Sequence, residues 1–117
     1  MSLFLSSFIF EKSQYDDAFF RLDALIESFT KNLPGFIGME SVADTMSGRT
    51  INNYYWRNRE DMEKLMTNIT HQQAKQQSQK WINGYQVIIA EIQGAHNNNL
   101  PHPLAELAVR YTPSASE

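Results

Sequence analysis

The sequence contains no cysteine, which excludes disulfides, thiolate nucleophiles and thiolate metal sites together. Basic residues are also few: 10 Lys and Arg against 13 Asp and Glu give a net charge of −3, and such a balance argues against a broad nucleic-acid-binding surface. No apolar run approaches the roughly 20 residues that a membrane-spanning helix needs. We therefore expect a protein that binds neither nucleic acid nor membrane.

Metal and cofactor motifs are missing as well. The three histidines, His71, His96 and His102, are scattered and form no metal-ligand pattern, and the sequence has no Gly-rich phosphate loop. We expect no metal and no cofactor. The apolar N-terminal stretch, residues 1–10, has no early Lys or Arg and is interrupted by three serines. It is not typical of a signal peptide, so we expect a cytoplasmic protein.

Hydrophobic periodicity predicts six elements in a chain of one-domain length. Their order is strand, helix, strand, strand, helix, strand. This is the split βαβ, ferredoxin-like pattern of α+β folds, with an antiparallel sheet and both helices on one face. The predicted strands are residues 3–10, 36–43, 50–56 and 85–93, and the predicted helices run from a cap at Ser13 to Leu33 and from Arg59 to Lys80.

The chain after residue 96 has a different composition. We expect a domain at 1–96 and a C-terminal extension at 97–117 that begins with an Asn- and Pro-rich linker. Within the extension, residues 104–111 fit either a short helix or an added strand, and residues 112–117 are expected to be disordered.

The second predicted helix carries two apolar stripes that are out of phase. Met62, Leu65 and Ile69 share one face, but His71 lies about half a turn away from it. Thr70, with Gln73 three residues later, also matches a capping box. The sequence therefore predicts a break in this helix between Asn68 and His71.

The sheet is expected to be apolar on both faces. In the last strand, Val87 and Ile89 alternate with Ile88 and Ala90, so large side chains point both ways. Two helices can cover only one face, and a sheet that is apolar on both faces needs a second cover. We expect a homodimer whose protomers pack through their sheet faces.

Several short motifs follow one another in a recognisable order. They are Pro34-Gly35-Phe36-x-Gly38, Tyr55-Trp56-x3-Glu60, His71-x2-Ala74 and Trp81-x3-Tyr85-x5-Glu91. Over residues 3–96 the sequence resembles the antibiotic biosynthesis monooxygenase family of dimeric α+β barrels. The resemblance implies a pocket between sheet and helices, and a small aromatic molecule as its ligand. It also implies cofactor-free oxidation of a planar phenolic, anthrone or polyketide-like compound.

At the residues that the family uses for catalysis, this sequence matches half of the pattern. Cofactor-free members carry an Asn four residues before a Trp on the third strand, and Asn52 and Trp56 stand at that spacing. Their Tyr and Arg positions hold Met62 and Gln76 here. Haem-degrading members use an Asn, a Trp and a His where this chain has Ser6, Leu65 and Lys75, so we set haem degradation aside.

Asn52, Trp56 and His71 are the candidate catalytic residues. An Asn amide and an indole N–H can donate to a developing oxyanion, and a histidine titrates in the range that suits a base. Tyr54, Met62 and Leu65 are candidate substrate-binding residues, because they could line the pocket between sheet and helices. Each has a structural alternative as an ordinary core or strand residue. A non-catalytic dimer that binds a small aromatic molecule therefore remains the second hypothesis.

Overall fold

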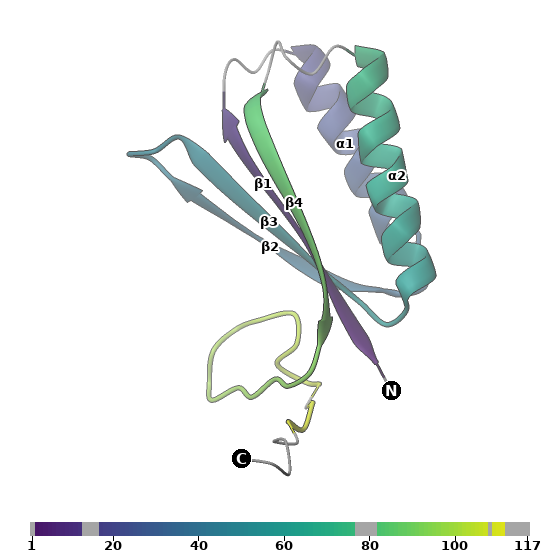
Figure 1. Ribbon diagram of the computed structural model, residues 1–117, viewed down its shortest axis with the longest axis vertical. Coiled ribbons are helices and arrows are strands. Elements are labelled where there is room, and N and C mark those ends of the chain that lie inside the picture. Colours follow the sequence, from purple (N-terminus) through teal and green to yellow (C-terminus); the bar gives the residue numbers. More distant parts are fainter. Residues whose placement is uncertain (1, 13–16, 77–81, 108, 112–117) are drawn as a thin grey trace.

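The computed structural model describes residues 2–12, 17–76, 82–107 and 109–111 and confirms the predicted α+β order. The strands form one four-stranded antiparallel sheet in the order β2-β3-β1-β4 (Figure 1). The elements are β1 (Leu3–Lys12), α1 (Asp17–Lys31), β2 (Phe36–Asp44), β3 (Arg49–Trp56), α2 (Arg59–Gln76) and β4 (Ile82–Ile92).

Strand β1 lies inside the sheet and alternates in two apolar sets. One set faces the helices (the helix face), and Phe8 and Phe10 belong to it; the other faces away from them (the open face). Because successive residues of a strand point to opposite faces, the cross-strand register assigns every partner to a face. Phe4 pairs with Trp56, whereas Leu5 pairs with Tyr55. The helix face therefore carries Trp56 and the open face carries Tyr55.

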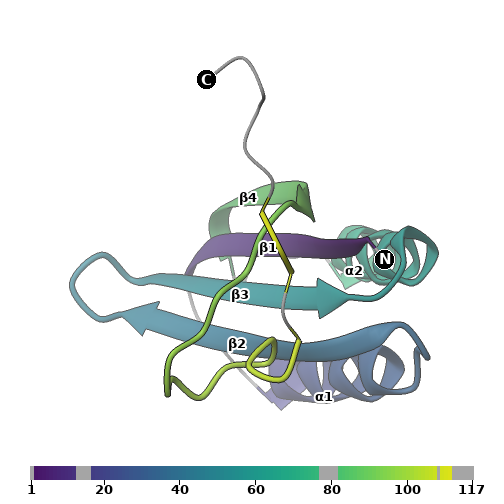
Figure 2. The ribbon, with the colours of Figure 1, turned by 90° about the horizontal axis from the view of Figure 1, so that it is seen from below.

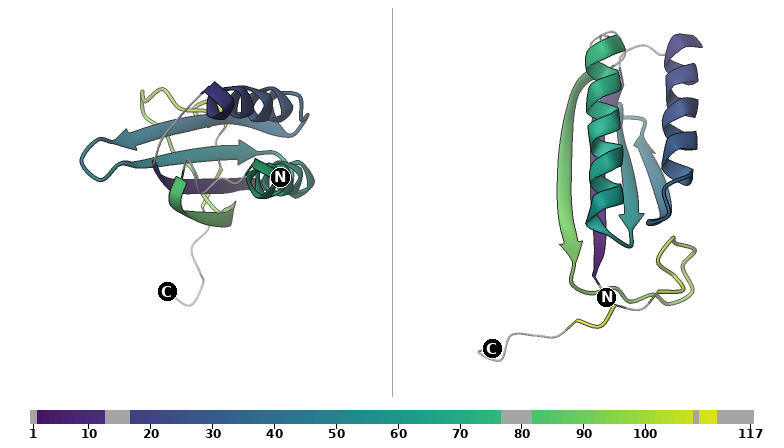
Figure 3. Two further views of the ribbon diagram at one scale, coloured as in Figure 1. Left: turned by 90° about the horizontal axis from the view of Figure 1, so that it is seen from above. Right: turned by 90° about the vertical axis from the view of Figure 1, so that its right-hand side faces the viewer.

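Helix α2 packs on β1 and β3, and α1 packs on α2 (Figure 3). Met62 and Leu65 of α2 are fully buried against Trp56. Together with Phe8 and Phe10 they form the core under α2, and burying each such side chain contributes about 1.5–3 kcal/mol. No described helix is long and apolar enough to cross a membrane.

The predicted break in the second helix is wrong. Helix α2 runs without interruption from Arg59 to Gln76, through the segment at Asn68 to His71. Its sequence contains no Gly or Pro, and Asn, Ile and Thr lower helix stability only by a few tenths of a kcal/mol each. A capping-box pattern is thus insufficient to stop a helix that is already anchored at its N-terminal half.

The open face is partly covered by the chain itself, which the sequence did not lead us to expect. Residues 95–107, the C-terminal strap, fold back beneath one end of the sheet (Figure 2). Leu104 is buried against Leu3 and Tyr55, and Ala95 forms an antiparallel bridge with Val109. The strap has turns at residues 103–106 and is otherwise irregular apart from this bridge, so the described residues of 104–111 form neither the predicted helix nor a full added strand. Residues 112–117 lie outside the described part of the chain.

A glycine makes room for the strap. A Cβ added at Gly38 would lie 2.9 Å from Cβ of Pro103, closer than carbon atoms approach without displacement. The strap therefore packs closely over β2 only because this position has no side chain.

A buried carboxylate joins the start of β2 to the start of α2. Asp61 is 6% exposed, and its Oδ2 accepts a hydrogen bond of 2.6 Å from the Gly35 backbone N–H. Asn58 caps α2, because its Oδ1 accepts from the Asp61 N–H at 2.8 Å. The Gly35 carbonyl accepts from the Arg57 N–H. The hydrogen bond from the Gly35 N–H, followed by those from Asn58 Nδ2 and Lys64 Nζ, holds the pKa of Asp61 below its usual range.

We predict that Asp61→Ala lowers the free energy of unfolding by about 1–3 kcal/mol, because the buried Gly35 N–H loses its acceptor. The folded pKa of Asp61 is depressed, so its stabilisation is present above the unfolded pKa of about 3.9 and is lost as the pH falls through the folded pKa. Urea denaturation across acidic pH measures this. Asp61→Asn should reduce the acid sensitivity, whereas Glu63→Gln, exposed on the same helix, should not.

Candidate active site

A pocket of about 520 Å³ lies between α1 and the helix face of the sheet, beside the core under α2. Its mouth is marked by Glu27 and Lys31, which are both exposed and form an ion pair of 2.7 Å. The opposite wall is the β2–β3 hairpin. The described lining residues are Ile26, Glu27, Thr30 and Lys31 from α1, Phe36, Gly38, Met39 and Ser41 from β2, and Asn52 and Tyr54 from β3.

Asn52 has an unsatisfied amide oxygen in this pocket. Its Oδ1 is buried and has no hydrogen-bond partner among the described residues. A buried polar atom without a partner typically costs about 1–3 kcal/mol, so such atoms in folded proteins call for an explanation. Because this oxygen is screened from solvent in the structure, a ligand hydroxyl would supply the missing donor once the Asn52 side chain turns towards the pocket.

The other strand residues of the prediction lie near Asn52 in different roles. Tyr54 lines the pocket two residues along the same face. Trp56, two residues further, is fully buried, and its Nε1–H donates to Ser6 Oγ at 3.0 Å. The indole N–H is therefore already bonded within the protein. The ring centroids of Phe36 and Trp56 are 5.4 Å apart. Because Phe36 lines the pocket, it lies between the Trp56 ring and the pocket.

Met62 and Leu65 belong to the core behind Trp56 and are not among the described lining residues. His71 lies within α2, twelve residues after its start, and its side chain is outside the described part. The expectation that His71 occupies the first turn of a helix is wrong, since α2 is continuous.

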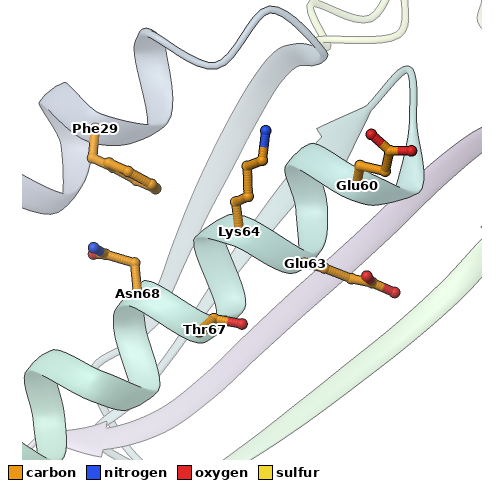
Figure 4. A pocket seen from close by; sticks show the side chains of 6 residues that line it. All are labelled: Phe29, Glu60, Glu63, Lys64, Thr67 and Asn68. Atoms are coloured by element: carbon orange, nitrogen blue, oxygen red, sulfur yellow. The ribbon is translucent and has the colours of Figure 1, made fainter.

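A second hollow lies on the outer surface between α1 and α2 (Figure 4), with a volume of about 620 Å³. Phe29 reaches towards α2, Lys64 and Asn68 lie on the facing side, and Glu63 points away. Its charged lining residues are exposed, and it contains none of the candidate catalytic side chains. We therefore place the site at the pocket that contains Asn52.

The open face carries a separate polar network centred on Glu40. Its Oε1 accepts from the Tyr55 hydroxyl at 2.6 Å and from Asn53 Nδ2 at 3.2 Å. The hydrogen bond from Tyr55 is the largest cause that holds the pKa of Glu40 below its usual value. In turn, burial and the hydrogen bond to the Glu40 carboxylate raise the pKa of Tyr55. His102 of the strap lies 3.3 Å from the same oxygen. Its Nδ1 accepts from the Leu104 N–H, which leaves Nε2 as the protonated nitrogen of the neutral ring.

Sequence reasoning missed the roles of five polar residues. Ser41, Thr30 and the Glu27–Lys31 pair line the pocket, and Ser6 is the acceptor of Trp56. The predicted hairpin of the second and third strands was a signal for Ser41, but only the register of the pairing shows that Ser41 lies opposite Asn52. For Ser6 a signal existed too, because strand alternation places it on the same sheet face as Trp56 of the paired strand β3.

No family model matches the sequence, and no curated protein matches it. Solved structures do match. SnoaB, a cofactor-independent oxygenase from Streptomyces nogalater, covers 87% of this chain and 100% of its own, with a TM-score of 0.56 and 11% identity. The monooxygenase from ActVA-Orf6 of Streptomyces coelicolor, in complex with nanaomycin D, covers 84% and 94%, with a TM-score of 0.59 and 14% identity.

A third match shares the fold. A Chloroflexus aurantiacus J-10-fl protein assigned to the antibiotic biosynthesis monooxygenases covers 82% of this chain and 98% of its own, with a TM-score of 0.54 and 13% identity. The chain has the fold of the antibiotic biosynthesis monooxygenases. This confirms the resemblance at the level of fold. At identities of 11–14% the likeness carries no residue roles, so those must come from the pocket itself.

We predict that Trp56→Phe mainly lowers stability. The substitution removes the donor to the fully buried Ser6 Oγ, at a cost of about 1–3 kcal/mol in the free energy of unfolding. Thermal denaturation would measure the loss. Adding Ser6→Ala to Trp56→Phe should recover part of it, because no buried hydroxyl then lacks its partner. A Trp56→Phe variant as stable as the wild type would contradict the prediction.

Proposed function

We propose that the protein is a cofactor-independent monooxygenase that oxidises a small planar phenolic, anthrone or polyketide-like molecule in the pocket between α1 and the sheet. The supporting observation is the buried amide oxygen of Asn52, which has no partner among the described residues and lies on a wall shared with Phe36 and Tyr54. Ligand sites typically combine an apolar pocket with a few placed polar groups. Cofactor-independent oxidation is also what the SnoaB structure is named for.

The chemistry requires a substrate that can itself reduce oxygen. An anthrone methylene loses a proton, and the resulting carbanion transfers one electron to O₂. Recombination with superoxide gives a hydroperoxide, and loss of water leaves a carbonyl. The methylene is oxidised to C=O, and O₂ supplies one oxygen atom to the product and one to water. The protein must hold the substrate, stabilise its anion and limit access of bulk water.

The candidate residues divide these tasks. The Asn52 amide can accept from the substrate hydroxyl through Oδ1 and, after rotation, donate to the oxyanion through its NH₂ group. Tyr54 and Phe36 offer ring surfaces to a planar molecule, and Trp56 backs this wall. His71 remains the candidate base by resemblance, and a cytoplasmic location remains a prediction from the sequence.

A non-catalytic binding protein is the second candidate. The observation in its favour is that the Trp56 N–H is bonded to Ser6, so it cannot at the same time stabilise an oxyanion in this arrangement. In that case the same pocket would hold an aromatic molecule without turnover.

We predict that Asn52→Ala slows oxidation of dithranol, an anthrone, by about 100- to 1,000-fold, the usual effect of removing one oxyanion donor. Oxygen uptake by metal-free protein, measured at saturating dithranol, gives the rate. Binding should weaken less, because the amide interacts more strongly as charge develops.

Asn53→Ala is the matched control. Asn53 is the next residue of β3 and faces the opposite side, where it bonds Ser7 and Glu40. Its loss should leave the oxidation rate within a few-fold of the wild type. Equal rates for Asn52→Ala and the wild type would reject the oxygenase proposal and favour the binding protein.

We further propose that the protein is a homodimer through the open face. The strap covers only one end of it, and Val42 and Ile88 beyond the strap are 57% and 46% exposed. Exposed large apolar side chains on one sheet face favour a protein partner, and a second copy presents the same face.

The dimer prediction can be tested by sedimentation. At micromolar concentration the wild type should be a dimer that buries more than roughly 2,000 Å² in total. Ile88→Asp should give a monomer, because it places an unpaired charge in the interface. Ile89→Asp is the control, since Ile89 is 52% exposed on the helix face of the same strand. A wild-type monomer would refute the prediction.

A further inference from the structure

Ser41 lies directly opposite Asn52 in the pocket wall. The two residues are Cα partners in the β2–β3 pairing. Neighbouring partners, Met39 with Tyr54 and Ala43 with Thr50, are two positions away on either side, so Ser41 and Asn52 both project from the helix face. Both line the same pocket. Directly opposite strand residues have Cβ atoms about 4.5–5.5 Å apart, so the two side chains are neighbours on this wall, although Ser41 does not bond the Asn52 amide oxygen.

The other polar side chains of the pocket have protein partners. Thr30 Oγ1 donates to the Ile26 carbonyl at 2.7 Å. Glu27 and Lys31 form an ion pair with each other. The Asn52 amide oxygen, in contrast, is buried without a partner among the described residues. The polar contact that a ligand would find on the sheet wall is therefore the pair formed by Asn52 and Ser41.

The pair has a definite hydrogen-bonding character. Asn52 Oδ1 can only accept, so it requires a donor such as a phenolic hydroxyl. A serine hydroxyl donates as well as accepts, so Ser41 can donate to a second oxygen beside that hydroxyl. A planar aromatic that carries two oxygens on neighbouring ring positions would satisfy both groups at once. Two oxygens on distant rings could satisfy only one.

We propose that Ser41 is a specificity-determining residue that, with Asn52, selects aromatic substrates bearing a hydroxyl next to a second oxygen. The proposal rests on the proposed function, since it names the substrate class of the same pocket. It assigns a hydrogen-bonding role to a residue of β2, whereas the β2 residue used above, Phe36, offers only a ring surface.

The test uses two isomeric dyes that are already quinones and contain no oxidisable methylene. In alizarin the two hydroxyls lie on adjacent carbons, and in anthraflavic acid they lie on opposite rings. Titration of each dye with the full-length protein, below the pKa values of the phenols, gives affinities from the change in visible absorption. The variants are Ser41→Ala, Ser41→Thr, which keeps the hydroxyl, and Ser28→Ala, an exposed serine of α1 that is not among the pocket residues.

The wild type should bind alizarin more tightly than anthraflavic acid. Ser41→Ala should weaken alizarin binding about 2- to 10-fold, the effect of one neutral hydrogen bond, and leave anthraflavic acid unchanged. Ser41→Thr should retain the preference, and Ser28→Ala should bind both dyes as the wild type does. A wild type without the preference, or a Ser41→Ala variant that keeps it, would overturn the proposal.

The failure of this inference and that of the proposed function are distinguishable. Dye binding involves no turnover, so a protein that prefers alizarin through Ser41 but consumes no oxygen with dithranol would retain the substrate-class inference and lose the oxygenase. Conversely, if oxygen uptake depends on Asn52 but Ser41→Ala changes the affinity for neither dye, the oxygenase proposal is retained and the substrate-class inference is rejected.

Discussion

The position of the pocket depends on the bond between Gly35 and the buried carboxylate of Asp61. Gly35 follows α1 by only four residues and precedes β2 directly, so a bond from its N–H to α2 connects three elements at one point. The Gly35 carbonyl completes the joint by accepting from Arg57, at the end of β3. A charge-assisted bond in a buried place resists displacement more than a neutral one. The last turn of α1 is thereby held against the β2–β3 hairpin, with the pocket between them.

The neighbouring residues Asn52 and Asn53 show how the two sides of one strand differ. Asn53 lies on the open face, where Ser7 donates to its oxygen and its NH₂ group donates to Glu40. On the open face the polar groups of Asn53 therefore have hydrogen-bond partners, and His102 of the strap joins the same network. Asn52 lies on the helix face with an oxygen that no described residue satisfies. Two adjacent asparagines thus differ in their hydrogen bonding, and only Asn52 has an amide oxygen that a ligand could still bond.

The sequence predicted the sheet because strand alternation and turn chemistry are local properties. The same alternation correctly placed Asn52 and Trp56 on one face and suggested the importance of both faces. Three features depended on contacts distant in sequence and were missed. The strap docks through Leu104 and His102 onto residues about 50 or more positions earlier. The Trp56 N–H donates to Ser6, which is 50 positions earlier in the sequence, and Asp61 accepts from Gly35, which is 26 positions earlier. Its spacing from Asn58 was a capping signal, but no local pattern reveals Gly35 as its partner.

The hydrogen bond from the Trp56 N–H to Ser6 limits what Trp56 can do in the pocket. A donor that is bonded to a fully buried serine cannot turn to a substrate without leaving Ser6 unsatisfied, at a cost similar to what it would contribute. Trp56 is better suited to hold the wall rigid, since its ring is fixed by Ser6 at one end and packs against Phe36. Stabilisation of a developing anion then falls to Asn52. A rigid wall helps that task, because a dipole held in place by its surroundings needs no reorganisation when charge appears. The unpaired amide costs stability in the empty protein, and a ligand hydroxyl that meets it recovers that free energy on binding.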